Sequence, residues 1–583
     1  MIVEPVHNSE IRSAAGGRVA RFTKRALRGD SDTFADHSGS RKVVRIERVA
    51  LAFVLLAALL LRLHNIGFGL PSMYDPDEPI FMITALKMLT QQTLNPGWFG
   101  HPGSTTIYLV ALSDALVVGF GRLSGSYGNL AEFTRAAYAD PGLLFIPARV
   151  AMALLGVASV WLTYVVGRRL HGTATGLIAA ALLAVNALHI AWSQVIRTDI
   201  HASVFMLVVL FLSIRIVENG KWKDYILAGI VTGFAIATKW PAASIVAAIV
   251  GAFAYRCRMQ SSWREESGKL AIAGIATLVG LFLASPFIFL DWQTVLANVA
   301  GEARPIHLGH TGGGFASNLA SYLRYQVAGS MGWVGLLFVL AGVIVSGVRA
   351  PAARWTVIPA TAAFLILICA QNLIWSRWLL PAMPMFCIFA GVAVVALSNM
   401  LARRVGSRAA RPILIGAVGL VAIPSVLGAY DQSVERSNDT RDQVARWAIA
   451  NIPPGSTIVL EHLALKLRHQ QWTILFPIGD AGCIDGVKLL STGVRYEDVQ
   501  RLRNGSPIVD LGHVPPHRRP SCRADFAILT YYDLYKTEAA MFPDQVANYE
   551  ALLAGGRTVA LFRPYPGRAD GPIVRVVALQ HNR

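Results

Sequence analysis

About eleven apolar stretches, most of them close to the length of a membrane-spanning helix, dominate this sequence. A helix needs about 20 mostly apolar residues to cross a bilayer. We predict spans at 49–66, 143–166, 175–191, 202–217, 225–238, 242–255, 270–290, 325–348, 355–370, 379–401 and 412–430. Only 15% of the residues are charged, against roughly 25% in soluble proteins. The sequence therefore predicts an all-α polytopic membrane protein.

Basic residues are spread unevenly between the predicted spans. Cytoplasmic loops of membrane proteins carry an excess of Lys and Arg. With eleven spans, the basic stretches all fall on one side, at 18–48, 168–169, 215–223, 256–269, 349–354 and 403–411. This pattern places the N-terminus in the cytoplasm, below a plasma (inner) membrane. The net charge of +18 therefore reports orientation, and no basic patch with interleaved aromatic residues indicates a nucleic-acid partner.

A further apolar run, at 104–120, is long enough to be considered as a span. Counting it would reverse every later loop and break the charge pattern, so we predict a helix that lies along the membrane within a first external loop at 67–142. The run before it carries Thr84, Lys87 and Gln91 as a polar stripe on an apolar helix. Such a stripe is typical of an interfacial amphipathic helix.

We predict three parts: a disordered basic cytoplasmic tail at 1–48, a transmembrane domain at 49–430 and a small external α/β domain at 431–583. The tail is polar and poor in aromatic residues, as disordered segments are. The last part mixes a helix-like run with short β-like runs and proline-rich turns. Cys483 and Cys522 fall in it, and an oxidising compartment would allow them to pair, which the sequence leaves open.

An acidic loop, Gly69–Pro79, follows the first span and holds Asp75, Asp77 and Glu78. Charged residues at a membrane boundary often mark a functional site. Because proline is best tolerated in the first helical turn, a helix should start near Asp77, which could then be only its N-cap. Glu78 points about 100° away on a helix, so we expect it to order the loop or to bond a neighbouring base.

Other polar residues also collect at the external ends of the predicted spans. With the acidic loop they form the set Asp77, Glu78, His101, Arg149, Arg197, Asp199, His201, Lys239, Asp291 and Arg377. Several have a structural alternative: an Arg197–Asp199 pair that caps a helix, a snorkelling Lys239, an interfacial anchor of Arg377 with its tryptophans, and a turn position for His101. Their occurrence on one face predicts an external cavity for an anionic ligand and a proton acceptor.

Several of these segments resemble GT-C glycosyltransferases, most closely the family 39 group of protein O-mannosyltransferases and aminoarabinose (lipid A) transferases. The similar segments, in order, are Tyr74–Pro79, Asn95–Gly103, Pro147–Arg149, Arg197–Asp199, Ala237–Lys239, Ser285–Pro286 and Arg377–Pro381. They cover roughly 49–401, and no single one is specific. The lipid A transferases have a lysine where His101 stands, and their double proline is Pro102-Gly103 here, which weakens the case for that substrate.

The resemblance implies inverting transfer of a hexosyl or pentosyl group from a polyprenyl-phosphate donor to an acceptor hydroxyl or phosphate on the external face. The acceptor would be a protein or a cell-envelope glycolipid or glycan. The implied catalytic residues are Asp77, Glu78 and Asp199, and the implied substrate-binding residues are His101, Arg149, Arg197, Lys239 and Arg377. Asp77 is the expected base. Asp199 would either orient the acceptor or share a divalent metal with Asp77. Arg197, Lys239 and Arg377 would hold the donor phosphate through charge-assisted hydrogen bonds. Metal dependence stays open.

A membrane transporter or lipid flippase with an external binding domain is the rival prediction. Transporters typically show inverted repeats and broken helices near the middle of the bilayer. The sequence shows neither feature, and its polar residues gather at one face. We therefore favour the glycosyltransferase, without a choice of sugar or acceptor.

Overall fold

In the computed structural model, the described residues are 37–259, 262–461, 467, 470–491, 501 and 509–579. Residues 1–36, most of the predicted tail, lie outside them. The chain divides into two compact units, Met1–Phe53 and Val54–Arg583, so the predicted external domain falls in the same unit as the transmembrane helices. Helix α2 (His37–Leu63) includes residues 37–48, which we expected to be disordered. The helix extends into them because Arg, Lys and Glu are good helix formers.

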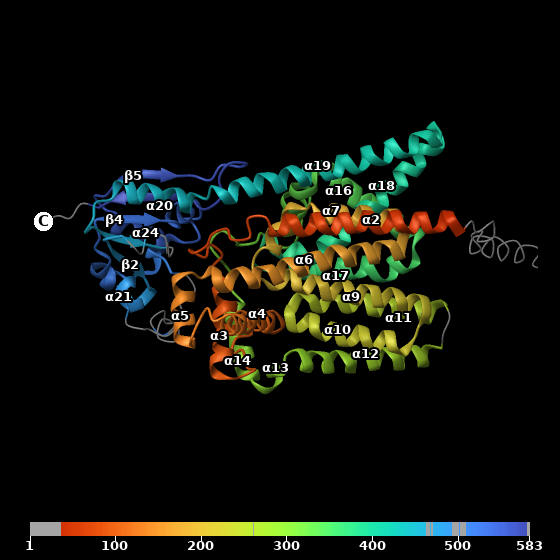
Figure 1. The fold of residues 1–583 in the computed structure, drawn as a ribbon, viewed down its shortest axis with the longest axis horizontal. Coiled ribbons are helices and arrows are strands. Elements are labelled where there is room, and N and C mark those ends of the chain that lie inside the picture. The colour runs from red at the N-terminus through yellow and green to blue at the C-terminus, as the bar shows by residue number, and fades with distance from the viewer. Residues whose placement is uncertain are drawn as a thin grey trace, which may run out of the picture. The chain divides into compact units, whose positions relative to one another are not determined.

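The second unit is built mainly of helices (Figure 1). The first half contains α3 (Glu78–Gln91), α4 (Ser104–Leu123), α5 (Leu130–Ala139), α6 (Gly142–His171), α7 (Thr173–Ala184), α8 (Ala187–Ser193), α9 (Thr198–Asn219), α10 (Trp222–Thr238), α11 (Val246–Met259) and α12 (Trp263–Ala284). The second half contains α13 (Phe287–Leu290), α14 (Trp292–Glu302), α15 (Phe315–Ser321), α16 (Ala328–Arg349), α17 (Ile358–Cys369), α18 (Met383–Val405), α19 (Ala410–Ser437) and α20 (Thr440–Asn451).

Within the described ranges, eight helices are long and apolar enough to cross a membrane, or up to nine if the bent pair α7–α8 is one span. The predicted count of eleven is therefore not confirmed. Three predicted spans are among neither these eight helices nor the bent pair. The span at 49–66 falls on α2, and those at 225–238 and 355–370 fall on α10, with 17 residues, and α17, with 12. The prediction of a polytopic helical membrane protein is confirmed.

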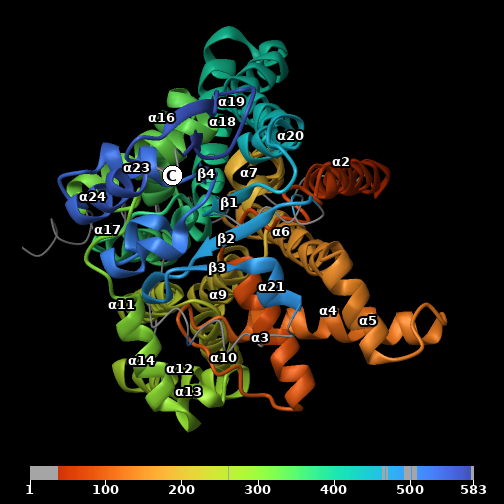
Figure 2. The ribbon, with the colours of Figure 1, turned by 90° about the vertical axis from the view of Figure 1, so that its left-hand side faces the viewer.

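Helix α4 passes the test of length and composition for a span, but its direction differs from that of the long helices. It is seen nearly end-on in Figure 1, where α9, α10 and α12 run across the picture, and lengthwise in Figure 2. Helices α3 and α5 also run across the direction of the long helices. The 104–120 segment is therefore a helix of spanning length that runs across the direction of the long helices.

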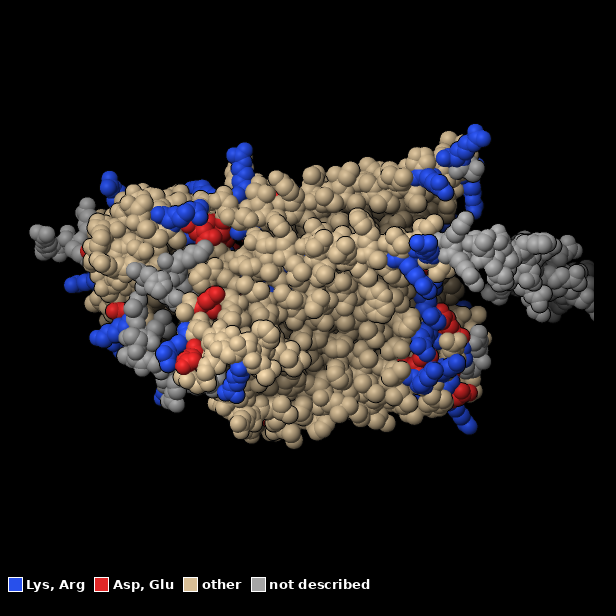
Figure 3. Space-filling model, viewed as in Figure 1, with Lys and Arg blue, Asp and Glu red and all other residues tan. Residues whose placement is uncertain are grey.

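One face of the helical bundle carries a broad uncharged band (Figure 3). In the space-filling view, the middle of the bundle has neither basic nor acidic residues, and Lys and Arg gather at the end away from the sheet (Figure 3). Apolar side chains on the helices are exposed over this region, for example Leu278 and Leu337, at 59% and 64%. An exposed apolar band between charged ends is what a bilayer core requires.

Glycines allow α10 and α12 to pack closely against each other. A Cβ on Gly233 of α10 would lie 2.2 Å from the backbone nitrogen of Leu281 in α12. A Cβ on Gly280 of α12 would lie 2.2 Å from the carbonyl oxygen of Ile230 in α10. Small residues let membrane helices approach to backbone contact, so this pair of helices is packed through its glycines.

The span predicted at 175–191 is broken, contrary to the expectation of unbroken helices. Helices α7 and α8 meet at an angle of 63°. The guanidinium of Arg62, which is fully buried, donates to the carbonyl oxygens of Ala184 at 3.0 Å and Leu183 at 3.2 Å. It thus satisfies carbonyls that the end of α7 leaves without helical partners. The break places α8 just ahead of Arg197.

The C-terminal part contains a six-stranded sheet with the strand order β3-β2-β1-β4-β6-β5. Its strands are β1 (Thr457–Leu460), β2 (Thr473–Pro477), β3 (Cys483–Asp485), β4 (Phe526–Leu529), β5 (Arg557–Phe562) and β6 (Val574–Ala578). Strand β1 pairs in parallel with β2 and β4, and the other pairs are antiparallel. Helices α21 (Gly486–Ser491), α23 (Tyr532–Thr537) and α24 (Pro543–Leu552) complete this α/β region, hereafter the sheet domain together with α20.

Alternation along β1 builds two cores, one on each side of the sheet. Ile458 and Leu460 pack in a core that includes residues of α20, and Val459 packs in a core that includes residues of α23 and α24. Successive side chains of a strand point to opposite faces, so four residues suffice to join both cores. Cys483 and Cys522 form a disulfide between β3 and the segment before β4.

Candidate active site

The acidic loop leads into α3, which starts at Glu78 with Pro79 in its first turn, as predicted. Asp77 occupies the N-cap position but makes no side-chain capping bond. Asp75 does so instead: its Oδ1 accepts from the backbone nitrogens of Asp77 at 2.9 Å and Glu78 at 3.3 Å. The sequence suggested that Asp77 could be only a cap, but the side chain that caps the helix is that of Asp75. The Asp77 carboxylate is left for other contacts.

Glu78 and Arg149 form an ion pair in which both side chains are fully buried. The Arg149 Nε and Nη2 atoms donate to Glu78 at 2.9 and 2.6 Å, and Nη1 donates to the carbonyl oxygens of Ile66 and Phe68 at 2.8 Å each. Glu78 also accepts from the backbone nitrogen of Ile196 at 2.9 Å. The pair therefore joins α3 to α6 and to the segments before the acidic loop and before α9. This is the neighbouring base expected for Glu78, and neither side chain has an exposed face.

Arg197 lies at the N-cap position of α9 and reaches the acidic loop. Its Nη2 donates to Asp75 Oδ1 at 2.5 Å, its Nε donates to Asp75 Oδ2 at 3.2 Å, and its Nη1 forms an ion pair with Asp77. The expected local pair between Arg197 and Asp199 is not what the structure contains. Burial lowers the pKa of Arg197 to about 10, so the guanidinium stays charged at neutral pH.

Asp199, two residues on, forms its ion pair with Lys239 instead. Both are buried, and Lys239 follows the last residue of α10. The backbone of Lys239 also forms a bridge with Pro102, next to His101. Burial and the nearby Lys239 and Arg377 lower the pKa of His101 to about 3, so this ring is neutral at physiological pH.

Arg377 completes the cluster from the segment before α18. Its Nη2 lies 3.4 Å from Asp77 Oδ2. Its Cζ lies 4.1 Å from the ring centroid of Trp375 and 5.9 Å from that of Trp192. On Trp375 the His310 ring stacks with a centroid distance of 3.5 Å. The expected tryptophan contact is present, and it holds the guanidinium beside Asp77.

The structure thus joins Asp77, Arg197 and Arg377 directly, with the Asp199–Lys239 pair within electrostatic reach of both arginines. Asp77 has the most exposed side chain of these five, at 25%. Glu78 and Arg149 support the cluster from within the fold.

Two further residues of the predicted set have structural partners outside the cluster. Asp291 accepts from the Asn95 amide at 3.0 Å and from the Thr294 hydroxyl at 2.7 Å. His201 lies 3.2 Å from the Thr106 hydroxyl. The structure therefore does not bring Asp291 or His201 to Asp77.

Sequence reasoning missed His307, His310 and Trp192, all of which flank Arg377. The rings of His307 and Trp375 have a centroid distance of 5.2 Å, and those of His307 and His310 a distance of 5.6 Å. The spacing of His307 and His310, three residues apart in a predicted external loop, was the sequence feature that could have pointed to them. Within the described part of the chain, no group of three or more His, Cys, Asp and Glu is placed to hold a metal ion.

One family model matches the chain. Residues 142–289 match the family described as dolichyl-phosphate-mannose-protein mannosyltransferase. The predicted family resemblance is confirmed over this segment. The match runs from the start of α6 to α13 and includes Arg149, Arg197, Asp199 and Lys239, and it supports a glycosyl-transfer enzyme. Comparison with curated protein sequences gives no match.

The chain is also similar to solved structures at low sequence identity. Apo ArnT from Cupriavidus metallidurans is 13% identical, with a TM-score of 0.48 over 93% of this chain and 98% of that chain. The same protein bound to undecaprenyl phosphate gives 13% and 0.47 over 92% and 98%. The archaeal oligosaccharyltransferase AglB from Archaeoglobus fulgidus, in complex with an inhibitory peptide and a dolichol-phosphate, gives 13% and 0.49 over 88% and 72%.

Proposed function

We propose that this protein moves a sugar from a polyprenyl-phosphate donor to an acceptor hydroxyl or phosphate at the external face of the plasma membrane. The observation that carries the proposal is the meeting of Arg197 and Arg377, from separate segments, at the partly exposed Asp77. A lipid-linked phosphate requires fixed cations at the membrane boundary, and an acceptor hydroxyl requires a base beside them. The match to a family of lipid-phosphate-sugar transferases supports the same reaction class.

The two arginines and Lys239 bind the donor phosphate in this proposal. Each of these cations is paired with a carboxylate: Arg197 with Asp75 and Asp77, Arg377 with Asp77, and Lys239 with Asp199. A phosphate oxygen makes charge-assisted hydrogen bonds as strong as those of a carboxylate, and the fork of arginine can bind two oxygens at once. Negative charge develops on the leaving phosphate during transfer, so cations held there stabilise the transition state.

Asp77 acts as the general base on the acceptor. When the donor phosphate takes over Arg197 and Arg377, the Asp77 carboxylate loses two stabilising partners and becomes a better proton acceptor. Its side chain is 25% exposed, so an acceptor hydroxyl can approach it. Asp199 holds Lys239, and His101 stays neutral next to it. Glu78 and Arg149 position α3 from behind and touch no substrate.

Two features support an external location for the site and the sheet domain. Lys and Arg concentrate at the opposite end of the bundle, as they do on the cytoplasmic side of membrane proteins. The sheet domain contains the Cys483–Cys522 disulfide, and disulfides persist in oxidising compartments. The acceptor is then an external protein or a cell-envelope glycolipid or glycan.

The test is the Asp77→Asn variant in membranes supplied with labelled polyprenyl-phosphate mannose and, separately, polyprenyl-phosphate aminoarabinose. Asparagine keeps the size of the side chain and its hydrogen bonds to arginine but cannot take a proton. We expect transfer to endogenous acceptors to fall at least 100-fold. The matched control is Asp140→Asn, an exposed loop aspartate that accepts from the Gly142 backbone nitrogen. Wild-type transfer by the Asp77→Asn protein would refute the assignment of the base.

A further inference from the structure

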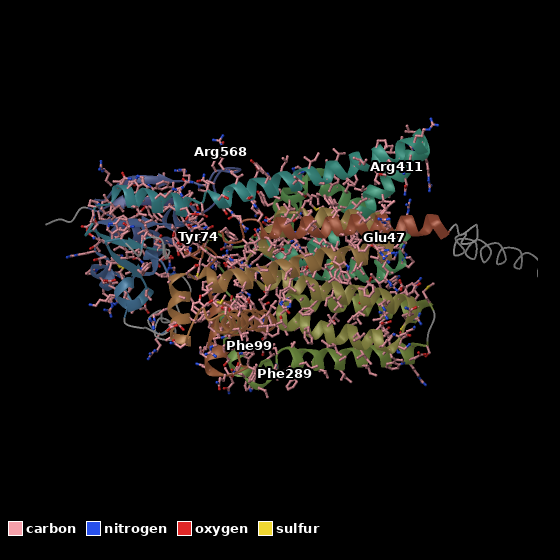
Figure 4. All side chains as sticks on the ribbon, viewed as in Figure 1. Glu47, Tyr74, Phe99, Phe289, Arg411 and Arg568 are labelled. Atoms are coloured by element: carbon pink, nitrogen blue, oxygen red, sulfur yellow. A yellow bond between two sulfur atoms is a disulfide. The ribbon has the colours of Figure 1, made fainter. Side chains whose placement is uncertain are left out.

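The sheet domain contacts the acidic loop through Tyr74, the residue just before Asp75. The Tyr74 hydroxyl donates to Asp442, and Arg441 Nη1 donates to the Tyr74 carbonyl oxygen at 3.2 Å. The Arg441 Cζ lies 3.8 Å from the centroid of the Tyr74 ring. Figure 4 shows Tyr74 between the bundle and the sheet domain. Both Arg441 and Asp442 belong to the first turn of α20, so one helix end holds this part of the loop.

Further contacts hold both Arg441 and Tyr74 in place. Arg441 Nε and Nη2 donate to Asp439 at 2.9 and 2.7 Å, and Asp439 also caps α20 through the Arg441 backbone nitrogen at 2.8 Å. On the loop side, Tyr74 packs against Gly69, where a Cβ would lie 2.9 Å from the tyrosine ring. Gly69 also has φ +70°, which favours glycine. The Tyr74 ring therefore packs between the backbone of Gly69 and the guanidinium of Arg441.

The sheet domain also contacts a second loop of the site, the segment between α14 and α15. Leu308 of this segment is 3% exposed and packs in the core that contains Val459 of β1. The next backbone nitrogen, of Gly309, lies 3.1 and 3.2 Å from the two carboxylate oxygens of Glu538, which follows α23. The following residue is His310, which stacks on Trp375.

This second loop is bonded to the segment that carries Arg377. The Ile374 backbone nitrogen donates to the His310 carbonyl oxygen at 2.9 Å, and the Gly312 nitrogen donates to the Asn372 carbonyl oxygen at 2.7 Å. A shift of the loop would therefore move the segment before Arg377 as well. The sheet domain thus contacts the loop that carries Asp77 and, separately, the loop bonded to the segment that carries Arg377.

We infer that the sheet domain is a positioning element of the membrane site, with Arg441 and Glu538 as its positioning residues. Arg441 sets the loop that bears Asp77, and Glu538 sets the loop bonded to the Arg377 segment. Neither loop has regular secondary structure around these contacts, so their spacing depends on tertiary contacts. The geometric part stands by itself, and its effect on turnover rests on the proposed function. Misplacing a reacting group by about 1 Å can cost on the order of 100-fold in rate.

The experiment is hydrogen–deuterium exchange on the full chain in lipid nanodiscs. Arg441→Ala should raise exchange in the 69–79 segment about 10-fold, while the 303–314 segment keeps its wild-type rate. Glu538→Ala should do the reverse. Arg441→Lys, which keeps the charge but not the fork, should restore part of the protection. The control is Arg519→Ala, which removes a domain arginine bonded to Asn548 and should change neither segment.

A turnover measurement on the same variants separates this inference from the proposed function. With polyprenyl-phosphate mannose or aminoarabinose, we expect Arg441→Ala to lower kcat at least 10-fold and to change the donor KM less than about 2-fold. Wild-type exchange in both loops of a folded Arg441→Ala protein would overturn the inference, whatever the activity. Absence of transfer in every protein, wild type included, with the predicted exchange pattern, would instead count against the proposed function alone.

Discussion

The buried pair of Glu78 and Arg149 gives the sharpest test of how the acidic loop is supported. Glu78→Gln leaves the size unchanged but removes the negative charge. The Arg149 Nε and Nη2 donors, at 2.9 and 2.6 Å from the two carboxylate oxygens, would then face one oxygen and one NH₂ group. One donor loses its acceptor, and a fully buried guanidinium loses its counter-charge. Breaking a buried ion pair costs about 3–5 kcal/mol of folding free energy.

A double-mutant cycle measures this value. The free energies of unfolding of Glu78→Gln, Arg149→Met and the double variant would come from SDS titration in mild detergent micelles. We expect each single variant to lose about 3–5 kcal/mol, and the double variant to lose clearly less than the sum. The control is Arg169→Met, which breaks the half-exposed pair with Glu218 and should cost less than about 1 kcal/mol. A loss below 1 kcal/mol in Glu78→Gln would refute the reasoning about burial.

Three further predictions concern other parts of the chain. Asp114 of α4 is fully buried, and neither carboxylate oxygen has a hydrogen-bond partner among the described residues, so Asp114→Leu should raise the free energy of unfolding by about 1–3 kcal/mol; a loss would mean that the carboxyl is satisfied. Burial, with His307 and Arg377 nearby, lowers the pKa of His310 to about 4. The neutral ring therefore contributes fully to the free energy of unfolding above pH 6.5, and this contribution is lost as the pH falls toward 4. Between pH 7 and pH 5, the free energy of unfolding should fall about 2 kcal/mol more in wild type than in His310→Phe, and an equal fall in both proteins would contradict this. The Cys483–Cys522 disulfide closes a separation of 39 residues, so the double serine variant should lose about 3–4 kcal/mol, which reduction of the wild type should reproduce.

Much of the helical framework could be predicted because it depends on one physical rule. A bilayer needs apolar helices of a certain length, and this requirement leaves a direct signal in the sequence. The start of α3 near Asp77 was predicted from Pro79 for a similarly local reason. The broken span was missed because its cause, Arg62 at the end of α7, lies more than 100 residues away in sequence.

The pairing within the site was predicted less well. Arg197 and Asp199 were considered as a local pair, but residues two apart at a helix start do not face each other. Their real partners, Asp77 and Lys239, come from distant segments. The capping role of Asp75 was missed because Asp77 occupies the cap position by sequence. The contribution of the sheet domain was invisible, because Arg441 and Glu538 belong to no motif and act only through tertiary contacts.

The central claim is that Arg197 and Arg377 hold a lipid-linked phosphate beside Asp77. Its most direct measurement is the binding of undecaprenyl phosphate to purified wild type, Arg197→Gln and Arg377→Gln, followed by tryptophan fluorescence, since Trp192 and Trp375 flank Arg377. Loss of one charge-assisted contact should weaken binding about 10- to 100-fold. Arg135→Gln, which removes an exposed arginine of α5, should bind like wild type. Unchanged affinity in both Arg197→Gln and Arg377→Gln would contradict the account.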